Sequence, residues 1–451
     1  MMQPSGNLAG RLLRPFQEFA QAETSGGIVL LCCTVIALGW ANSFWSASYS
    51  QLWETHFALS FASWKLDKSL HFWINDGLMA VFFFLVGLEL KREVLVGELA
   101  SFRHAVLPLV AAVGGVIFPA IIYVIFNAGG RGVAGWGIPM ATDIAFALGV
   151  LALLGERIPL TLKIFLTAFA IFDDIIAVMM IAFFYSGGIN LLALGLAGVV
   201  LVGLVAINLL GARALTVYIA LGVVLWLLIL QSGIHATIAG VLLAMVIPAR
   251  ARIDAQDFLD EGYALLGEFE RADAPGIGLY MNDDQQSAVQ ALEVAAERLQ
   301  TPLQRLEHML HNPVSFVVVP LFVLANAGVY LRGGALLDNL FSPVSLGVFF
   351  GLVVGKQLGI TLFSWLAVVL RWTELPRDVS WLHIYGVSWL GGIGFTMSLF
   401  IDGLAFEQTS QEMLDQAKVG ILLAALIAGS VGYVILRHAC RVGQEAVVEA
   451  G

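Results

Sequence analysis

Long apolar segments, separated by short polar ones, occupy most of the chain. About twelve of them are candidate membrane helices, because roughly 20 consecutive apolar residues in a helix cross the hydrocarbon core of a bilayer. Their approximate positions are 26–43, 70–90, 104–126, 140–155, 159–185, 189–209, 212–231, 233–249, 313–333, 345–370, 381–403 and 416–438. This pattern predicts an all-α polytopic membrane protein, with residues 1–451 forming one integral membrane domain.

The composition agrees with this interpretation. The 451 residues are 59% hydrophobic and 12% charged, which is far from the balance of a soluble globular protein. The net charge of −10 is local in origin, because twelve of the 33 acidic residues lie between residues 250 and 312. The chain has no basic patch, so we expect no nucleic-acid partner. The three cysteines indicate no disulfide framework, and we expect no cofactor.

The lysines and arginines between the apolar segments predict the orientation. When the N-terminus is placed in the cytoplasm, sixteen of them fall on the cytoplasmic side and five on the outer side. Since cytoplasmic loops carry an excess of these residues, both termini are expected to be cytoplasmic. The acidic loop 250–312 is then cytoplasmic as well, with a helix at 285–300 and a flexible stretch at 272–284.

The outer connection 44–69 differs from a simple loop. Residues 57–67 alternate loosely between apolar and polar side chains, which predicts a small β-hairpin. The exposed edge of such a hairpin offers a place where a second subunit can pair. A plain connector between two spans is an equally good interpretation of the same residues.

Two adjacent carboxylates lie near the middle of the segment 159–185. A charge at the bilayer centre costs about 2.5–3.5 kcal/mol on insertion scales, so Asp173 and Asp174 require an explanation. They are either protonated or paired structural groups, or a cation site that also binds protons. Asp143, on the preceding antiparallel segment, lies at about the same depth, because it is ~18 Å from the connecting turn and Asp173 is ~21 Å from it. The coincidence favours a cation site.

Segments 136–149 and 390–399 are apolar but contain several glycine and hydroxyl residues, and the first also contains a proline. This composition predicts that the helix is interrupted in each segment. Interrupted helices in corresponding positions of two halves indicate an inverted-repeat transporter, with repeats at about 104–186 and 345–439. Unwound backbone leaves helix ends whose dipoles need counter-charges. Asp143 and Lys356 are the candidates, and Lys356 needs a carboxylate partner under any interpretation because an unpaired buried ammonium is costly.

At these residues the chain closely resembles the NhaA-type sodium/proton antiporters of bacteria. The matching stretches are 73–83, 85–93, 141–155, 162–174, 232–240, 305–308, 322–328 and 392–398. The resemblance implies about twelve helices, with two broken helices crossing at mid-membrane, and a location in the bacterial inner membrane. It also implies a homodimer formed through residues 44–69.

The resemblance further implies roles for individual residues. The ion-binding and proton-carrying pair is Asp173 and Asp174, Thr142 and Asp143 belong to the crossing, and Lys356 is the charge partner. The pH-responsive positions implied by the family are Glu89, Arg92, Glu93, Glu307, His308 and His311, with Asp76 and His235 as further positions of influence. This chain departs from the family pattern at Gln357, where proline is familiar, at the added carboxylate Asp402, and in its longer acidic loop.

The resulting hypothesis is a transporter, not an enzyme, that exchanges internal Na⁺ or Li⁺ for external H⁺. We expect two protons per cation, so that exchange is electrogenic, and regulation by pH. An intramembrane aspartyl protease is one alternative, but its Gly-x-Gly-Asp motif is missing because Phe395 follows Gly391–Gly394. A sodium-coupled symporter of small anions is another, and no arginine lies in the interior of a predicted span to bind its substrate.

Overall fold

The computed structural model describes residues 25–61, 64–249, 255–272, 282–330, 335–376, 378–407 and 409–450. The N-terminal segment and most of the stretch predicted to be flexible, 272–284, lie outside the described residues. The first half contains α2 (Ser25–Ala41), α3 (Ser46–Glu54), β1 (His56–Phe61), β2 (Trp64–Ser69), α4 (Leu70–Phe72), η1 (Trp73–Leu78), α5 (Met79–Leu95), η2 (Glu98–Ala100), α6 (Phe102–Asn127), η3 (Arg131–Met140), α7 (Ile144–Ala152), η4 (Gly155–Arg157), α8 (Leu160–Phe184), α9 (Leu191–Leu209), α10 (Leu215–Ser232) and α11 (Ile238–Val246).

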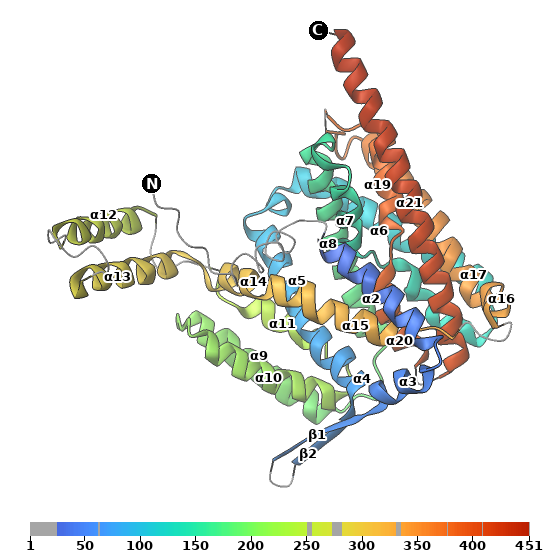
Figure 1. Ribbon diagram of the computed structural model, residues 1–451, viewed down its shortest axis with the longest axis horizontal. Coiled ribbons are helices and arrows are strands. Elements are labelled where there is room, and N and C mark those ends of the chain that lie inside the picture. Colours follow the sequence, from blue (N-terminus) through green and yellow to red (C-terminus); the bar gives the residue numbers. More distant parts are fainter. Residues whose placement is uncertain are drawn as a thin grey trace.

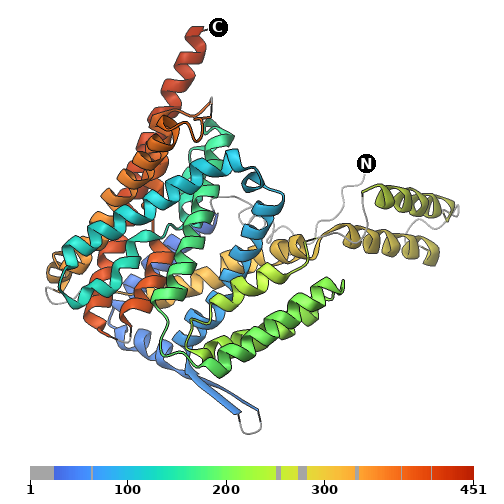
Figure 2. The ribbon, with the colours of Figure 1, turned by 180° about the vertical axis from the view of Figure 1, so that it is seen from behind.

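The second half is also helical in its described part. It contains α12 (Ala255–Arg271), α13 (Asp283–Leu299), α14 (Pro302–Pro313), η5 (Val314–Val318), α15 (Val319–Asn326), α16 (Ala335–Leu340), α17 (Pro343–Phe350), η6 (Gly351–Gly355), α18 (Lys356–Val369), α19 (Trp381–Gly391), α20 (Phe395–Phe406) and α21 (Gln411–Ala450). The result is an all-α polytopic membrane protein, as predicted, with one small hairpin (Figures 1 and 2).

The helices long and apolar enough to cross a membrane number eight in the described residues, or eleven if three bent pairs each count as one span. The predicted segment 233–249 is not among them, because only the nine residues of α11 are helical. Residues just before α11 form turns instead: Gly233 ends α10 in the left-handed conformation, at φ +82°. A Cβ on Gly233 would lie 2.2 Å from the carbonyl oxygen of Gly188, so glycine is required there.

Both predicted helix interruptions are present. η3 and α7 meet at a bend of 42°, and α19 and α20 meet at a bend of 42°. Each predicted repeat region therefore holds a broken pair between longer helices, α6 and α8 in one region and α17–α18 and α21 in the other. The repeat relationship itself stays a prediction.

The hairpin projects from the bottom of the molecule in Figure 1, and the helices of the long loop, α12 and α13, project from its left side. β1 and β2 pair antiparallel from His56↔Ser69 to Phe61↔Trp64, which confirms the predicted hairpin. α13 confirms the predicted helix at 285–300, and α12, which was not predicted, packs beside it. We call the part of the molecule around β1 and β2 the hairpin end, and the part from which α12 and α13 project the loop end.

The prediction that a span begins at residue 313 was wrong, because helix begins at α14, eleven residues earlier. Thr301 caps α14 by accepting a hydrogen bond from the backbone N–H of Gln304, whose side chain returns one to Thr301. Pro302 occupies the first turn, where its missing N–H costs nothing. These start signals precede Pro313, which lies inside the helix just before the π-helical turn η5.

α8 lies at the centre of the packing. In the most apolar stretch of 18 residues of this helix, 56% of the residues are buried. The corresponding value for α9 is 17%, because the apolar side chains of α9 face outward, as those of a lipid-facing helix do. α6 packs on α8, α17 and α18, and α21 packs on α17, α19 and α20. We call this set, with η3, α7 and η6, the repeat unit. We call the set α5, α9, α10, α11, α14 and α15, with α4 and η1, the panel, because α5 packs on α11 and α14 and α10 packs on α9.

Candidate functional site

The two helix breaks cross beside each other. The backbone N–H of Asp143 donates to the carbonyl oxygen of Ile393 over 2.6 Å, which joins the breaks directly. The carboxylate of Asp143 then serves two helix N-termini: Oδ1 accepts from the Phe146 N–H at 2.9 Å in α7, and Oδ2 accepts from the Thr396 N–H at 3.0 Å in α20. Oδ2 also accepts from the Thr396 hydroxyl at 2.6 Å. Asp143 therefore lies where two positive helix ends meet.

The opposite side of the crossing presents carbonyl groups. The Thr142 hydroxyl donates to the carbonyl oxygen of Gly391, the last residue of α19, over 2.7 Å, and accepts from Lys356 Nζ at 3.1 Å. This places an ammonium group beside a helix C-terminus, where a positive charge is stabilised. Lys356 is fully buried and lies over the ring of Phe169 at 5.5 Å from its centroid.

Close helix packing holds Lys356 in position. α18, which begins at Lys356, crosses α6 so tightly that a Cβ on Gly359 would lie 2.1 Å from the carbonyl oxygen of Gly114. The preceding turn, η6, is π-helical and rotates the helix just before the lysine. The sequence Gly355–Gly359 therefore brings an ammonium group to the crossing, since any larger residue at Gly359 would separate the two helices.

Asp173 and Asp174 complete the group. Lys356 Nζ donates to Asp173 Oδ2 over 2.8 Å, and both aspartates are buried, at 0% and 1% exposure. Within the described residues, Oδ1 of Asp173 and Oδ1 of Asp174 have no hydrogen-bond partner. A buried carboxylate oxygen without a partner is costly unless it binds a proton or a cation. Of the three buried carboxylates, Asp143 is compensated by two helix N-termini and Asp173 by Lys356, so the charge of Asp174 is left to a proton or a cation.

The structure brings five of the predicted site residues together at the crossing: Thr142, Asp143, Asp173, Asp174 and Lys356. It also adds residues that the sequence did not single out. Thr396 and the carbonyl groups of Gly391 and Ile393 belong to the crossing. Thr396 lies within a stretch that resembles the family, but a backbone carbonyl carries no residue-type signal, and only the predicted unwinding could indicate it.

Five of the eight residues predicted for pH response meet at the loop end. Arg92 of α5 contacts Glu93 Oε1 at 2.8 Å and Glu307 Oε1 of α14 at 2.9 Å, and His311 Nδ1 lies 3.9 Å from Glu89 Oε1. These contacts join α5 to α14. His308 is exposed and, being next to Glu307 on a helix, points about 100° away from it.

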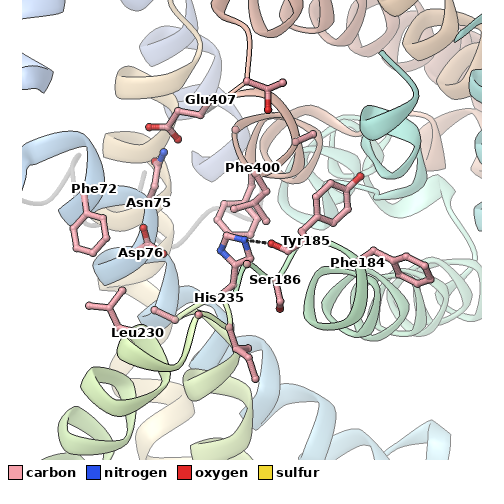
Figure 3. A pocket seen from close by; sticks show the side chains of 18 of the residues that line it. Phe72, Asn75, Asp76, Phe184, Tyr185, Ser186, Leu230, His235, Phe400 and Glu407 are labelled. Carbon is pink, nitrogen blue, oxygen red and sulfur yellow. Dashed lines mark hydrogen bonds between the residues drawn. The ribbon is translucent and has the colours of Figure 1, made fainter. Parts of the chain in front are cut away.

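The other two, Asp76 and His235, lie toward the hairpin end, in the wall of a cavity of about 670 Å³ (Figure 3). His235 Nε2 lies 2.8 Å from the carbonyl oxygen of Tyr185, and burial lowers the pKa of this histidine despite that contact. Asp76 is one residue of η1, and Trp226 donates its indole N–H to the Asp76 carbonyl oxygen at 3.0 Å. The predicted pH-responsive residues thus fall into two separate places.

A cluster of three aromatic rings adjoins this cavity. Phe400 of α20 lines the cavity and packs on Phe83 of α5 and Phe322 of α15, with ring centroids 5.4 and 6.2 Å away. Phe83 and Phe322 are buried, at 1% and 0% exposure. The three rings bridge the panel and the repeat unit.

Two of the three departures from the family pattern, Asp402 and Gln357, are buried polar groups. Asp402 of α20 is 0% exposed and neither of its carboxylate oxygens has a hydrogen-bond partner among the described residues. Lys418 of α21 acts on it electrostatically and donates a hydrogen bond to the Gly328 carbonyl oxygen at 3.5 Å. Gln357 is 4% exposed, and within the described residues neither amide atom is hydrogen-bonded.

Gln357→Met is expected to leave the thermal stability of the protein unchanged or to raise it by a few degrees. A buried amide that makes no hydrogen bond costs free energy, whereas methionine fills a similar volume without polar atoms. Thermal unfolding in detergent measures the change, with Gln416→Met on the surface as the matched control. A loss of several degrees for Gln357→Met alone would contradict this expectation and show that the amide stabilises the fold.

Comparison with known proteins agrees with this geometry. Residues 17–436 match the model of the family described as Na⁺/H⁺ antiporter 1. The chain is 50% identical to Na(+)/H(+) antiporter NhaA 2 of Syntrophotalea carbinolica, over 95% of this chain and 97% of that protein. It is 48% identical to Na(+)/H(+) antiporter NhaA of Oleidesulfovibrio alaskensis, over 95% and 94% of the two chains.

A third relative, Na(+)/H(+) antiporter NhaA of Koribacter versatilis, is 49% identical over 94% of this chain and 91% of its own length. The fold and the buried charges at two broken helices define a secondary transporter of the membrane. The chain belongs to the Na⁺/H⁺ antiporter 1 family, and the predicted resemblance to the NhaA-type antiporters is confirmed.

Proposed function

We propose that this protein exchanges Na⁺ or Li⁺ for H⁺ through one site at the crossing of the broken helices, formed around Asp173 and Asp174. The observation that carries the proposal is the pair of buried Oδ1 atoms without partners, one on each aspartate. Na⁺ and Li⁺ are hard cations that prefer oxygen ligands, and the Thr142 hydroxyl and unwound carbonyl groups lie beside the aspartates. A proton on a carboxyl group removes a ligand, so H⁺ and Na⁺ compete.

The charge of the site supports an exchange of two protons for one cation. Asp143 is committed to two helix N-termini, whereas Asp173 and Asp174 each keep an Oδ1 without a partner among the described residues, so these two carboxyl groups are the ones that change state. If both lose a proton when one Na⁺ binds, each cycle moves one net charge. Moving that charge through 100 mV is worth about 2.3 kcal/mol, so membrane voltage can drive Na⁺ export.

Alternating exposure in this proposal comes from movement of the repeat unit against the panel. The proposal places the hairpin end outside and the loop end, with both termini, in the cytoplasm of a bacterial inner membrane. In this proposal the Phe83–Phe322–Phe400 cluster, of which Phe400 lines the cavity, is the apolar barrier between the outer cavity and the aspartates. Protonation or Na⁺ binding reduces the negative charge of the site and lets the crossing pass this apolar barrier.

Regulation and assembly complete the proposal. The contacts of Arg92 with Glu307 and of His311 with Glu89 join α5 to α14 through groups that include a histidine, so their strength changes with cytoplasmic pH. We also assign the β1–β2 hairpin as the dimer contact, since its exposed edges offer unpaired backbone groups to a second copy. Deleting residues 56–69 would then convert dimers to monomers in cross-linking experiments.

The test of the exchange function is a proton-flux measurement in everted vesicles of a strain without other Na⁺/H⁺ antiporters. After respiration acidifies the lumen, addition of Na⁺ or Li⁺ should dissipate the pH gradient, whereas choline should not. Absence of dissipation in the wild-type protein between pH 6.5 and 9 would overturn the proposal.

A further inference from the structure

One ion pair crosses from the panel to the repeat unit at the hairpin end. His71 of α4 places Nδ1 3.1 Å from Glu407 Oε1, at the residue that follows α20. The two side chains are 25% and 47% exposed, so solvent reaches the pair. Glu407 lines the cavity that also contains Asp76 and His235, and it lies across that cavity from His235 (Figure 3). The pair therefore lies at the edge of the cavity, at the boundary between the two parts.

The other ring nitrogen of His71 faces two different partners. Nε2 lies 3.1 Å from Asn326 Oδ1 and 3.3 Å from Asn75 Nδ2. The orientation of Asn326 is defined, because its amide donates to Asn75 Oδ1 at 2.8 Å and to the Phe322 carbonyl oxygen at 2.9 Å. A protonated His71 donates to both Glu407 and Asn326, whereas a neutral one can donate to Glu407 and accept from Asn75. Both charge states are thus accommodated without moving the ring.

We propose that His71 and Glu407 form a pH-sensitive latch that holds the panel to the repeat unit at the hairpin end. His71 is fixed on the panel by Asn75 and Asn326, which lie on η1 and α15. Glu407 follows directly on α20, whose main packing partners are η3 and α21 of the repeat unit. Movement of α20 against the panel must therefore break this contact. The inference rests on the alternating movement proposed above and adds the residues that restrain it.

The sign of the pH effect follows from the charges. Burial raises the pKa of Glu407, but the hydrogen bond and charge of His71 outweigh burial and hold this pKa below its usual range. Glu407 is then anionic throughout the neutral range, and the pair is strongest when His71 carries its proton. Loss of the imidazole proton removes the positive charge that faces Glu407, so the latch is weaker when His71 is neutral.

Other charged groups act on the same pair from each neighbouring element. Lys68, at the end of β2, and Asp76 of η1 line the cavity with Glu407. Lys418 of α21 acts on Glu407 from the repeat unit, and Asp402 of α20 interacts with Glu407 as a like charge. Lys418 and Asp402 are buried, whereas the His71 side chain is 25% exposed and therefore within reach of solvent protons.

Cross-linking tests whether this contact must open. In a chain with Cys32, Cys33 and Cys440 replaced by serine, His71→Cys and Glu407→Cys are introduced together and joined by a short bifunctional thiol reagent. Exchange should fall at least tenfold on cross-linking and recover on reduction. The matched control joins Ser50→Cys to Tyr330→Cys, whose native side chains hydrogen-bond between α3 and the segment after α15, neither of which belongs to the repeat unit. That cross-link should leave exchange unchanged.

Undiminished exchange with His71→Cys and Glu407→Cys cross-linked would overturn the latch and leave the exchange function standing. Loss of exchange in wild-type vesicles would instead overturn the function itself. Should the cysteine pair be inactive before cross-linking, His71→Gln supplies the second measurement, because glutamine keeps a donor for Glu407 but does not titrate.

That second measurement is the exchange rate in right-side-out vesicles as the external pH is varied from 6 to 8 at constant internal pH. Between external pH 6 and 8, the exchange rate of the wild-type protein should rise several-fold more than the rate of His71→Gln. Glu407→Gln should lose the same increase. Identical profiles for the wild-type protein and His71→Gln would overturn the latch.

Discussion

Asp174→Asn is expected to abolish Na⁺-triggered and Li⁺-triggered proton flux in everted vesicles. Asparagine has nearly the same shape, but it cannot release a proton or offer a negative charge to a cation. Because Asp174 is buried with a free Oδ1, the substitution removes one of the two groups on which competition depends. Fluorescence dequenching after addition of NaCl or LiCl measures the loss.

The matched control for this substitution is Asp402→Asn. Asp402 is also a buried membrane carboxylate without hydrogen bonds, but it lies outside the contacts that join the crossing. Its variant should retain Na⁺-dependent flux. Retained flux in Asp174→Asn, or equal loss in both variants, would show that Asp174 is not the exchange site.

Lys356→Met is expected to be the most destabilising single substitution at the crossing. Lys356 is the ion-pair partner of Asp173 and both side chains are fully buried, at 0% exposure. Removing one partner of a buried pair leaves an uncompensated charge, at a cost of about 3–5 kcal/mol. The double variant Lys356→Met with Asp173→Asn removes both charges and should recover most of that stability. Thermal unfolding in detergent at pH 8 measures both variants.

The comparison of the single and double variants decides the result. If the double variant is as unstable as Lys356→Met alone, the lysine stabilises the fold through packing or through the Thr142 contact rather than through Asp173. If the single variant is as stable as the wild-type protein, Asp173 is already neutral when buried.

Much of the site could be predicted from residue types whose presence in a membrane is costly. Asp143, Asp173, Asp174 and Lys356 attract attention because each charge needs a reason to lie in an apolar segment. Glycine and proline between residues 136 and 149, and glycine between 390 and 399, predict unwound backbone, and the structure has both breaks. These signals are local, so the sequence alone carries them.

Contacts between distant segments could not be predicted in this way. His71 and Glu407 are separated by 336 positions, and each is an ordinary polar residue at the end of an apolar segment. The partner of Arg92 on α14 is similarly distant, and the family resemblance rather than the pattern indicated it. The start of α14 was missed for another reason: hydropathy alone set the boundary of that span, although Thr301, Pro302 and Gln304 carry a clear helix-start signal.

The central claim is that Na⁺ and H⁺ compete for one buried site. Calorimetric titration of the purified protein with Na⁺, in buffers of different ionisation enthalpy, measures affinity and proton release together. The account predicts proton release on binding and an apparent Kd that weakens by ~10-fold per pH unit for each competing proton as the site protonates. It also predicts no binding to Asp174→Asn. Na⁺ binding without proton release, with a Kd independent of pH, would contradict it.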